Sequence, residues 1–211
     1  MSLSSDPRRI RRLPCRGPGR IGRRRAPRPP RGTAAWPRLE RWELATDDVS
    51  GDAYHHFAQA LGVQLTRETA PILTALLDRS GNDRSVVGEA KTHWGTRRPY
   101  IGANQPICEA KTDHLAGNPD YPSGHSAHGV HVAMILAELA PQRADALYAR
   151  GREFAESRYI CGSHSYSAVE AGIQAGMVIY GAEHRSDVFR GDMEAARAEV
   201  QAALAHAAAI Q

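Results

Sequence analysis

Apolar residues recur at steps of three and four along most of the chain from residue 39 onward, which is the period of an amphipathic helix. The clearest example places Ile72, Leu73, Leu76 and Leu77 on one helix face before Gly81. Proline, glycine and capping residues mark the ends of such segments. The predicted helices cover residues 52–61, 69–80, 82–94, 123–140, 142–156 and 187–209, and a further helix carries residues 168–176.

No stretch alternates between apolar and polar residues over the length of a strand, so the pattern predicts an all-α fold, a helical bundle. Residues 99–122 are rich in proline and glycine and predict a long polar loop that closes over another part of the molecule. Ala168, Gly172 and Gly176 repeat every fourth residue. They predict a smooth helix face that a neighbouring backbone can approach closely.

The first residues have a different composition from the rest. Residues 1–41 hold 13 arginines against Asp6 and Glu40, a net charge of +11, which leaves −7 for the remaining residues. Proline and glycine interrupt the arginines without apolar periodicity, so we expect residues 1–38 to form a disordered tail and residues 39–211 to form one domain. The tail is either an arm for nucleic acid or an anionic membrane, or, as we favour, a solvated extension or a misassigned start. It shows no apolar segment of a secretory signal.

The length and the apolar runs bound the class of protein. A chain of 211 residues, 42% of them hydrophobic, is long enough for one domain with a sizeable core. The longest apolar stretches, residues 132–137 and 176–182, fall far short of the roughly 20 residues that span a bilayer. We therefore expect no membrane insertion.

Two segments combine groups that bind anions. Lys91 and Arg98 supply positive charge, and the guanidinium of Arg98 can form a fork on two phosphate oxygens. The sequence Tyr-Pro-Ser-Gly-His over residues 121–125 is a predicted helix start, where backbone N–H groups lack helical partners. With the Ser123 hydroxyl, these groups form an anion cradle, and Gly124 lets a phosphate come close.

A third segment adds another cation and a second imidazole. Ser157 and Arg158 are followed by His164, and His125 stands in the helix start described above. Phosphoryl transfer needs an attacking group, a proton donor and a cage of positive charge. Two histidines and three cations meet that need, so the three segments together predict a phosphoryl-transfer site.

These motifs resemble the signature of a known superfamily. The pattern Lys91-x6-Arg98-Pro99, Pro122-Ser-Gly-His125 and Ser157-Arg158-x5-His164 is similar to that of the phosphatidic acid phosphatase type 2 and vanadium haloperoxidase superfamily. Within it, the chain resembles the bacterial class A nonspecific acid phosphatases over about residues 39–211. The resemblance implies an all-helical bundle that hydrolyses small-molecule phosphate monoesters without a metal or other cofactor. It also implies a periplasmic location, and self-association is common in the family.

The resemblance assigns roles to individual residues. It implies that His164 is the nucleophile that becomes phosphorylated. It implies that His125 protonates the leaving alcohol and then activates water. The residues implied to bind the phosphate oxygens are Lys91, Arg98, Ser123, Gly124 and Arg158.

The chain departs from the family pattern at one position. The family places an aspartate four residues after the nucleophilic histidine, where its carboxylate orients the imidazole, and this chain has Ala168 there. Loss of the comparable carboxylate in the serine-protease triad costs about 10⁴ in turnover, or about 5 kcal/mol. Glu170 lies two residues further along, on another side of a helix. We therefore expect a protein that keeps the phosphate-binding groups but turns over slowly.

The spacing of histidines and cysteines bears on metal binding and on disulfide formation. His125, His128 and His131 repeat every third residue, and on a helix the outer two point about 240° apart, so the three cannot face one metal ion. The cysteines at positions 15, 108 and 161 form no C-x-x-C pair. Cys108 and Cys161 are either disulfide partners, in an oxidising compartment, or two buried thiols.

Three other functions remain open at this point. Vanadate-dependent halide oxidation would use the same cage, with vanadate in the place of the phosphate. A non-catalytic phosphate or phosphoester binder is motivated by Ala168. A role in nucleic-acid binding rests on the tail alone.

Overall fold

The computed structural model describes residues 36–50, 53–80, 85–103 and 105–209. The predicted tail lies outside these ranges, apart from its last three residues, which begin helix α1. In the described part, α-helices and short 3-10 helices make up the regular structure, and there is no strand, which confirms the predicted all-α fold. The elements are α1 (Trp36–Asp47), η1 (Ala53–Phe57), α2 (Ala58–Leu61), α3 (Pro71–Ser80), α4 (Ser85–Trp94), α5 (Asp113–Gly117), α6 (Gly124–Leu139), η2 (Pro141–Arg143), α7 (Ala144–Ile160), α8 (Tyr166–Glu183) and α9 (Asp187–Ala209).

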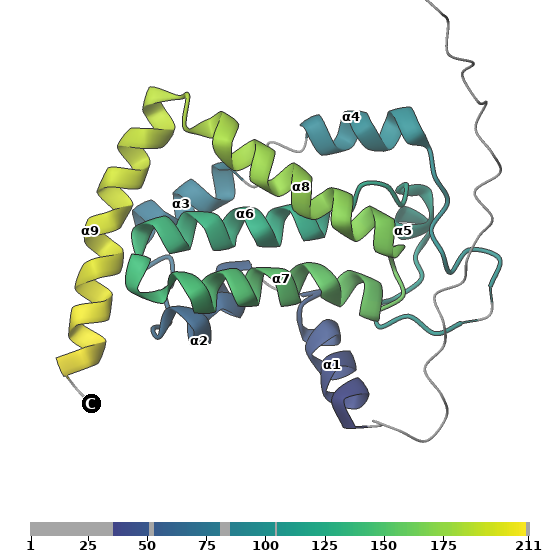
Figure 1. Cartoon of the computed structure of the whole chain (residues 1–211), viewed down its shortest axis with the longest axis horizontal. Coiled ribbons are helices and arrows are strands. Elements are labelled where there is room, and N and C mark those ends of the chain that lie inside the picture. Colours follow the sequence, from purple (N-terminus) through teal and green to yellow (C-terminus); the bar gives the residue numbers. More distant parts are fainter. Residues whose placement is uncertain (1–35, 51–52, 81–84, 104, 210–211) are drawn as a thin grey trace, which may run out of the picture. The chain divides into compact units, whose positions relative to one another are not determined.

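Helix α6 lies at the centre of the bundle. It packs against α7 along its length and against α8, which crosses it, while α9 packs on α3 and on the far end of α6 (Figure 1). Because α6 is covered on several sides, most of its side chains are buried, including Ile135 and Leu136. Phe57, Leu73 and Phe154 complete the same core from neighbouring elements. The burial explains why apolar residues occupy nearly every side of α6.

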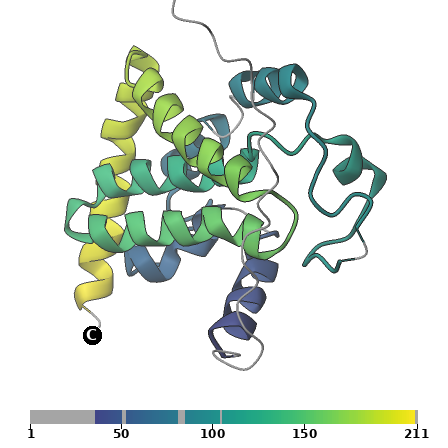
Figure 2. The ribbon, with the colours of Figure 1, turned by 45° about the vertical axis from the view of Figure 1, so that its right-hand side comes forward.

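The sequence pattern located most helices but not all of their details. The helix predicted over residues 52–61 is a 3-10 turn that continues into α2 and ends at Gly62, whose φ of 87° is the left-handed conformation that glycine adopts readily. The predicted loop over residues 99–122 contains the short helix α5, capped by the Thr112 side chain, which accepts a hydrogen bond from the Leu115 amide. This loop lies at the opposite end of α6 from α9 (Figure 2).

The small-residue face of α8 brings the start of α8 against the start of α6. A Cβ atom added to Gly172 would lie 2.4 Å from the Ser123 carbonyl oxygen, and one added to Gly176 would lie 2.4 Å from that of Ala127. The Ser123 amide donates a hydrogen bond of 2.9 Å to the carbonyl of Ala168. The predicted close approach of a neighbouring backbone is confirmed, and the neighbour is the first turn of α6. His164, just before α8, is thereby brought near His125.

No helix within the described ranges combines the length and the apolar content that crossing a bilayer requires.

Candidate active site

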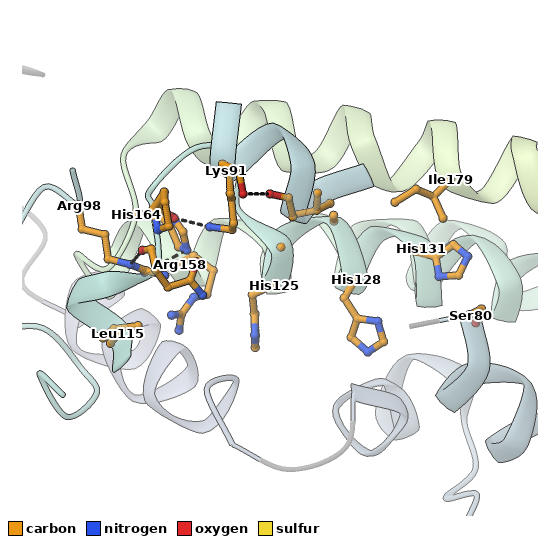
Figure 3. Close-up of a pocket in the computed structure, with 17 residues that line it drawn as sticks. Ser80, Lys91, Arg98, Leu115, His125, His128, His131, Arg158, His164 and Ile179 are labelled. Atoms are coloured by element: carbon orange, nitrogen blue, oxygen red, sulfur yellow. Dashed lines mark hydrogen bonds between the residues drawn. The ribbon is translucent and has the colours of Figure 1, made fainter. Parts of the chain in front are cut away.

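A cavity of about 630 Å³ opens at the N-terminal end of α6. Figure 3 shows cationic side chains gathered at one end of it, with His125 next along α6 and His128 and His131 further away. Six of the seven residues expected to bind or transform a phosphate line this cavity: Lys91, Arg98, Gly124, His125, Arg158 and His164. The cavity therefore joins groups from all three predicted segments, which are far apart in the sequence.

Ser123 is the expected site residue that does not line the cavity. It is fully buried as the N-cap of α6, and its hydroxyl oxygen accepts hydrogen bonds from the amide and the hydroxyl of Ser126. This arrangement fixes the helix start and leaves the neighbouring Gly124 at the cavity wall. Its observed contacts are those of a helix cap, and its contact with a phosphate stays a prediction.

Lys91 and Arg98 are held by the backbone of the segment just before α6. The Lys91 Nζ, in the last turn of α4, donates to the carbonyl of Pro119. The Arg98 Nε donates to the carbonyl of Asn118 at 2.7 Å, and its Nη1 donates to that of Ser163 at 3.1 Å. Backbone carbonyls therefore orient both cations, and these contacts leave the positive charges unneutralised.

The Arg158 side chain reaches the cavity with N–H groups that its ion pair does not use. The side chain is 5% exposed and its Nη2 is paired with the Glu109 carboxylate, which also accepts from the Ser163 hydroxyl. Among the described residues, the buried Nε and Nη1 of Arg158 have no hydrogen-bond partner. Buried donors without acceptors cost free energy, so these two N–H groups favour an anionic ligand at the cavity wall.

The imidazole of His164 is fixed on both sides. Its Nδ1 lies 2.9 Å from the Asp120 carboxylate, and its Nε2 lies 3.2 Å from the Arg98 Nη1. A carboxylate accepts hydrogen bonds and a guanidinium donates them, so the pair of contacts assigns the proton to Nδ1 and a lone pair to Nε2. Burial lowers the pKa of His164 to about 4, although Asp120 opposes that shift. Its neutral form therefore predominates above that pH.

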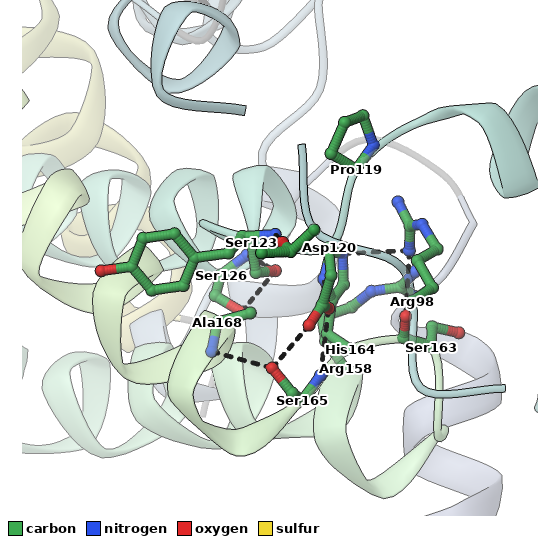
Figure 4. Close-up of polar contacts among 12 residues, drawn as sticks. Arg98, Pro119, Asp120, Ser123, Ser126, Arg158, Ser163, His164, Ser165 and Ala168 are labelled. Atoms are coloured by element: carbon green, nitrogen blue, oxygen red, sulfur yellow. Dashed lines mark hydrogen bonds and ion pairs between the residues drawn. The ribbon is translucent and has the colours of Figure 1, made fainter. Parts of the chain in front are cut away.

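The expectation that His164 lacks a carboxylate partner is wrong. Asp120, which lies two residues before Pro122 and is 4% exposed, contacts the imidazole from a different segment (Figure 4). Burial raises the pKa of Asp120, but hydrogen bonds from His164 and Ser165 outweigh it and hold the pKa below its ordinary value. The premise of slow turnover, an imidazole without an orienting acid, is therefore removed. The sequence shows an acid directly before the Tyr-Pro-Ser-Gly-His motif, but it does not show that this acid contacts His164.

His125 lies flat against an aromatic ring. Its imidazole stacks on Phe154 with ring centroids 4.5 Å apart and an angle of 8° between the planes. Burial, followed by the positive charge of Arg158, holds the pKa of His125 well below its ordinary value. Its Nε2 is buried and has no hydrogen-bond partner within the described ranges. An imidazole in this state can take up a proton when a negative charge enters the cavity, and then return it.

Lys91 is also shifted by its surroundings. Burial lowers the pKa of its ammonium group to about 8, and the nearby Arg98 adds to the shift. An anion bound among these groups would stabilise the charged form of Lys91 and the protonated form of His125 together. A bound anion would therefore increase the number of protonated groups in the site.

A disulfide stands directly beside the carboxylate that pairs with Arg158. Cys108 and Cys161 are joined, and the Cys108 amide donates to the Cys161 carbonyl at 3.3 Å. Glu109, which pairs with Arg158, directly follows Cys108, so the bridge anchors the carboxylate that orients this cation. Disulfides are typical of proteins from oxidising compartments. The periplasmic location itself stays a prediction.

The histidines further along α6 have separate surroundings. His131 is buried and its Nε2 lies 2.5 Å from the Glu183 carboxylate of α8. In the described part of the chain, no group of three or more histidine, cysteine or acidic residues is arranged to hold a metal ion.

Comparison with known proteins agrees with this geometry. Residues 72–191, more than half of the chain, match the model of the PAP2 superfamily. The chain is 38% identical over 168 residues to an acid phosphatase of Zymomonas mobilis, covering 77% of this chain and 64% of that protein. It is 32% identical to a non-specific acid phosphatase of Salmonella typhimurium, covering 76% and 66% of the two chains. A non-specific acid phosphatase of Providencia stuartii is 31% identical, with 76% and 67% covered.

The chain spans 64% and 66% of the lengths of the first two relatives. Residues 72–191, which match the family model, contain all three motif segments of the cavity. By the match over residues 72–191 and by its all-helical fold, the chain belongs to the PAP2 superfamily.

Proposed function

We propose that this protein is an acid phosphatase that hydrolyses phosphate monoesters through a phosphohistidine intermediate on His164. One observation carries the proposal: the Nε2 of His164, with its lone pair free of a proton, faces a guanidinium inside a cavity lined by three cations. A nucleophile placed among cations is the arrangement that phosphoryl transfer needs. The relatives described above carry names that agree with this activity.

Binding uses the cations and the start of α6. The Nε and Nη1 of Arg158 donate to phosphate oxygens, and Arg98 and Lys91 add N–H groups other than those that hold the backbone carbonyls. The amides of the first turn of α6, beside Gly124, add donors at the positive end of a helix 16 residues long. These contacts neutralise the charge on the equatorial oxygens in the transition state.

In the first step, the His164 Nε2 forms a bond to phosphorus and the bond from phosphorus to the ester oxygen breaks. The leaving oxygen takes a proton from the Nε2 of His125, which becomes neutral. Asp120 stabilises the positive charge that develops on the ring of His164. The products of this step are the alcohol and a phosphohistidine.

In the second step, water attacks phosphorus and transfers a proton to the Nε2 of His125. The bond from phosphorus to the Nε2 of His164 breaks, which releases inorganic phosphate and restores the imidazole with its lone pair. His125 holds a proton again and can protonate the next leaving group. Low pKa values for both histidines suit this exchange, because neither ring retains a proton permanently.

The decisive test is hydrolysis of p-nitrophenyl phosphate by the purified full chain at acidic pH. We expect saturable release of p-nitrophenol with turnover in the range of ordinary enzymes, about 1 to 10³ per second, because the nucleophile has its orienting carboxylate. Calorimetry with inorganic phosphate measures binding in the same preparation. Phosphate binding without any product release would contradict the proposal and leave a non-catalytic binder.

The pH dependence of kcat/KM should show an acidic optimum. His164 must be neutral to attack, so activity should rise as pH passes through about 4. His125 must carry a proton, and because its pKa is lowered the activity should begin to fall below the ordinary histidine range. A second decrease should follow through about pH 8, where Lys91 loses its charge.

A profile from about pH 3 to about pH 9 checks these limbs. The Lys91→Arg variant isolates the last one, because an arginine stays protonated over this range and should remove the decrease near pH 8. A profile that is flat between about pH 4 and about pH 8 would contradict the roles given to the two histidines.

A further inference from the structure

One carboxylate connects the nucleophile to the helix that follows it. The Asp120 Oδ1 lies 2.9 Å from the His164 Nδ1 and accepts a hydrogen bond of 3.1 Å from the Ser165 amide. Its Oδ2 accepts one of 2.6 Å from the Ser165 hydroxyl (Figure 4). Three hydrogen bonds to one buried carboxylate leave it little freedom to turn. The imidazole of His164 is therefore oriented by a group that is itself fixed.

The backbone around Asp120 serves the same site. Its amide donates to the Thr96 carbonyl at 2.8 Å, and the carbonyls of the two preceding residues accept from Arg98 and Lys91. One short segment before α6 thus holds both cations through its backbone and the nucleophile through its side chain. A shift of this segment would move the nucleophile and the cations together.

The position at which the family pattern requires the acid lies close to this carboxylate. Ala168 is fully buried, and its amide donates to the Ser165 hydroxyl at 3.2 Å, which in turn donates to Asp120. A carboxylate added at position 168 would enter the surroundings of the Asp120 carboxylate. Two acids at one site repel each other, and one of them takes up a proton.

We propose that Asp120 is the positioning residue of His164, and that it supplies from the segment before α6 the carboxylate that the sequence pattern places at position 168. The inference rests on the proposed function for its kinetic consequences. Asp120 does not touch the phosphate: it acts by holding the His164 proton on Nδ1 and by stabilising the charged ring. The two positions are alternatives, so an acid is needed at one of them and is harmful at both.

A swap of the acid between the two positions tests this. Asp120→Ala should lower kcat with p-nitrophenyl phosphate by about a hundredfold to ten-thousandfold, the range that loss of an orienting acid produces. Ala168→Asp in the otherwise native chain should give no gain in activity. The double variant Asp120→Ala/Ala168→Asp should recover at least about tenfold over Asp120→Ala. Asp113→Asn, at an exposed site on α5, is the control and should leave activity unchanged.

A second measurement separates positioning from a merely structural role. In ¹⁵N spectra of the histidine rings, the native protein should show His164 protonated on Nδ1 and not on Nε2. Asp120→Asn keeps the side-chain shape and should give a mixture of the two tautomers. The same variant should move the acid limb of kcat/KM to lower pH, because Asp120 raises the pKa of His164.

The outcomes divide clearly. Native-like turnover and tautomer in Asp120→Asn would overturn the proposal, and so would a folded double variant no more active than Asp120→Ala. A gain in activity for Ala168→Asp alone would also overturn it, since it would show that Asp120 is insufficient. If the native chain hydrolyses no ester, the proposed function fails while the ring spectra still decide the role of Asp120. Asp120→Asn serves in the same way if Asp120→Ala does not fold.

Discussion

Replacing His164 with alanine should abolish hydrolysis of phosphate monoesters, with a loss in kcat of about 10⁴-fold or more. The variant removes the only group among the described cavity residues whose nitrogen lone pair is both oriented by a carboxylate and directed at a guanidinium. Binding should persist, because Lys91, Arg98 and Arg158 are untouched. Kinetics with p-nitrophenyl phosphate and calorimetry with inorganic phosphate measure the two properties separately.

The phosphorylated enzyme gives a direct readout of the same prediction. Rapid quenching of the native protein during turnover should yield a phosphoryl group on the peptide that contains His164, in a linkage stable to base and labile to acid. The variant should give none. His206→Ala, at an exposed position on α9, is the matched control and should retain full activity. Turnover by the His164→Ala variant within about a hundredfold of the native rate would contradict the role of nucleophile.

Much of the phosphate-binding group is predictable from the sequence because its members stand beside local helix signals. Lys91 stands in the last turn of α4, which ends at Trp94 just before a glycine, and Gly124 follows the N-cap Ser123 at the start of α6. Such signals depend on residues a few positions apart, and the sequence displays them directly. The predicted roles of these residues nevertheless await the kinetic tests.

The contact between Asp120 and His164 could not be predicted from the sequence, for a different physical reason. Asp120 and His164 are 44 residues apart, and they meet only because α8 packs closely on the first turn of α6. Glu109 and Arg158 are likewise 49 residues apart, with the former in a loop without apolar periodicity. Local pattern cannot rank one acid above another for such contacts. The family pattern pointed to position 168 and therefore to an incomplete site, where the fold supplies the acid from elsewhere.

The close packing of α8 on α6 gives the second large effect, through Gly172→Ala. The new Cβ would lie 2.4 Å from the Ser123 carbonyl oxygen and 2.9 Å from the Ser126 Cβ, far inside van der Waals contact. Because the first atom belongs to the backbone, α6 and α8 must separate. Overpacking of this kind costs about 1 to 3 kcal/mol, of which the better helix propensity of alanine offsets up to about 1 kcal/mol.

Gly181→Ala is the matched control on the same helix. No atom lies within 4 Å of a Cβ built there, so alanine should stabilise the protein by about 0.5 to 1 kcal/mol. Urea denaturation of both variants measures the free energies of unfolding, which should change in opposite directions. Equal or greater stability for Gly172→Ala than for the native chain would contradict the packing argument.

Activity should separate the two variants further than stability does. Ser123 caps the helix start whose amides face the cavity, and its own amide is tied to Ala168, one turn before Gly172. A displacement there moves Gly124 and His125 relative to His164. Gly172→Ala should therefore lose kcat/KM under conditions where the protein is still fully folded, while Gly181→Ala should match the native chain. The difference would show that the glycine face of α8 sets the alignment of the two histidines as well as the packing of the bundle.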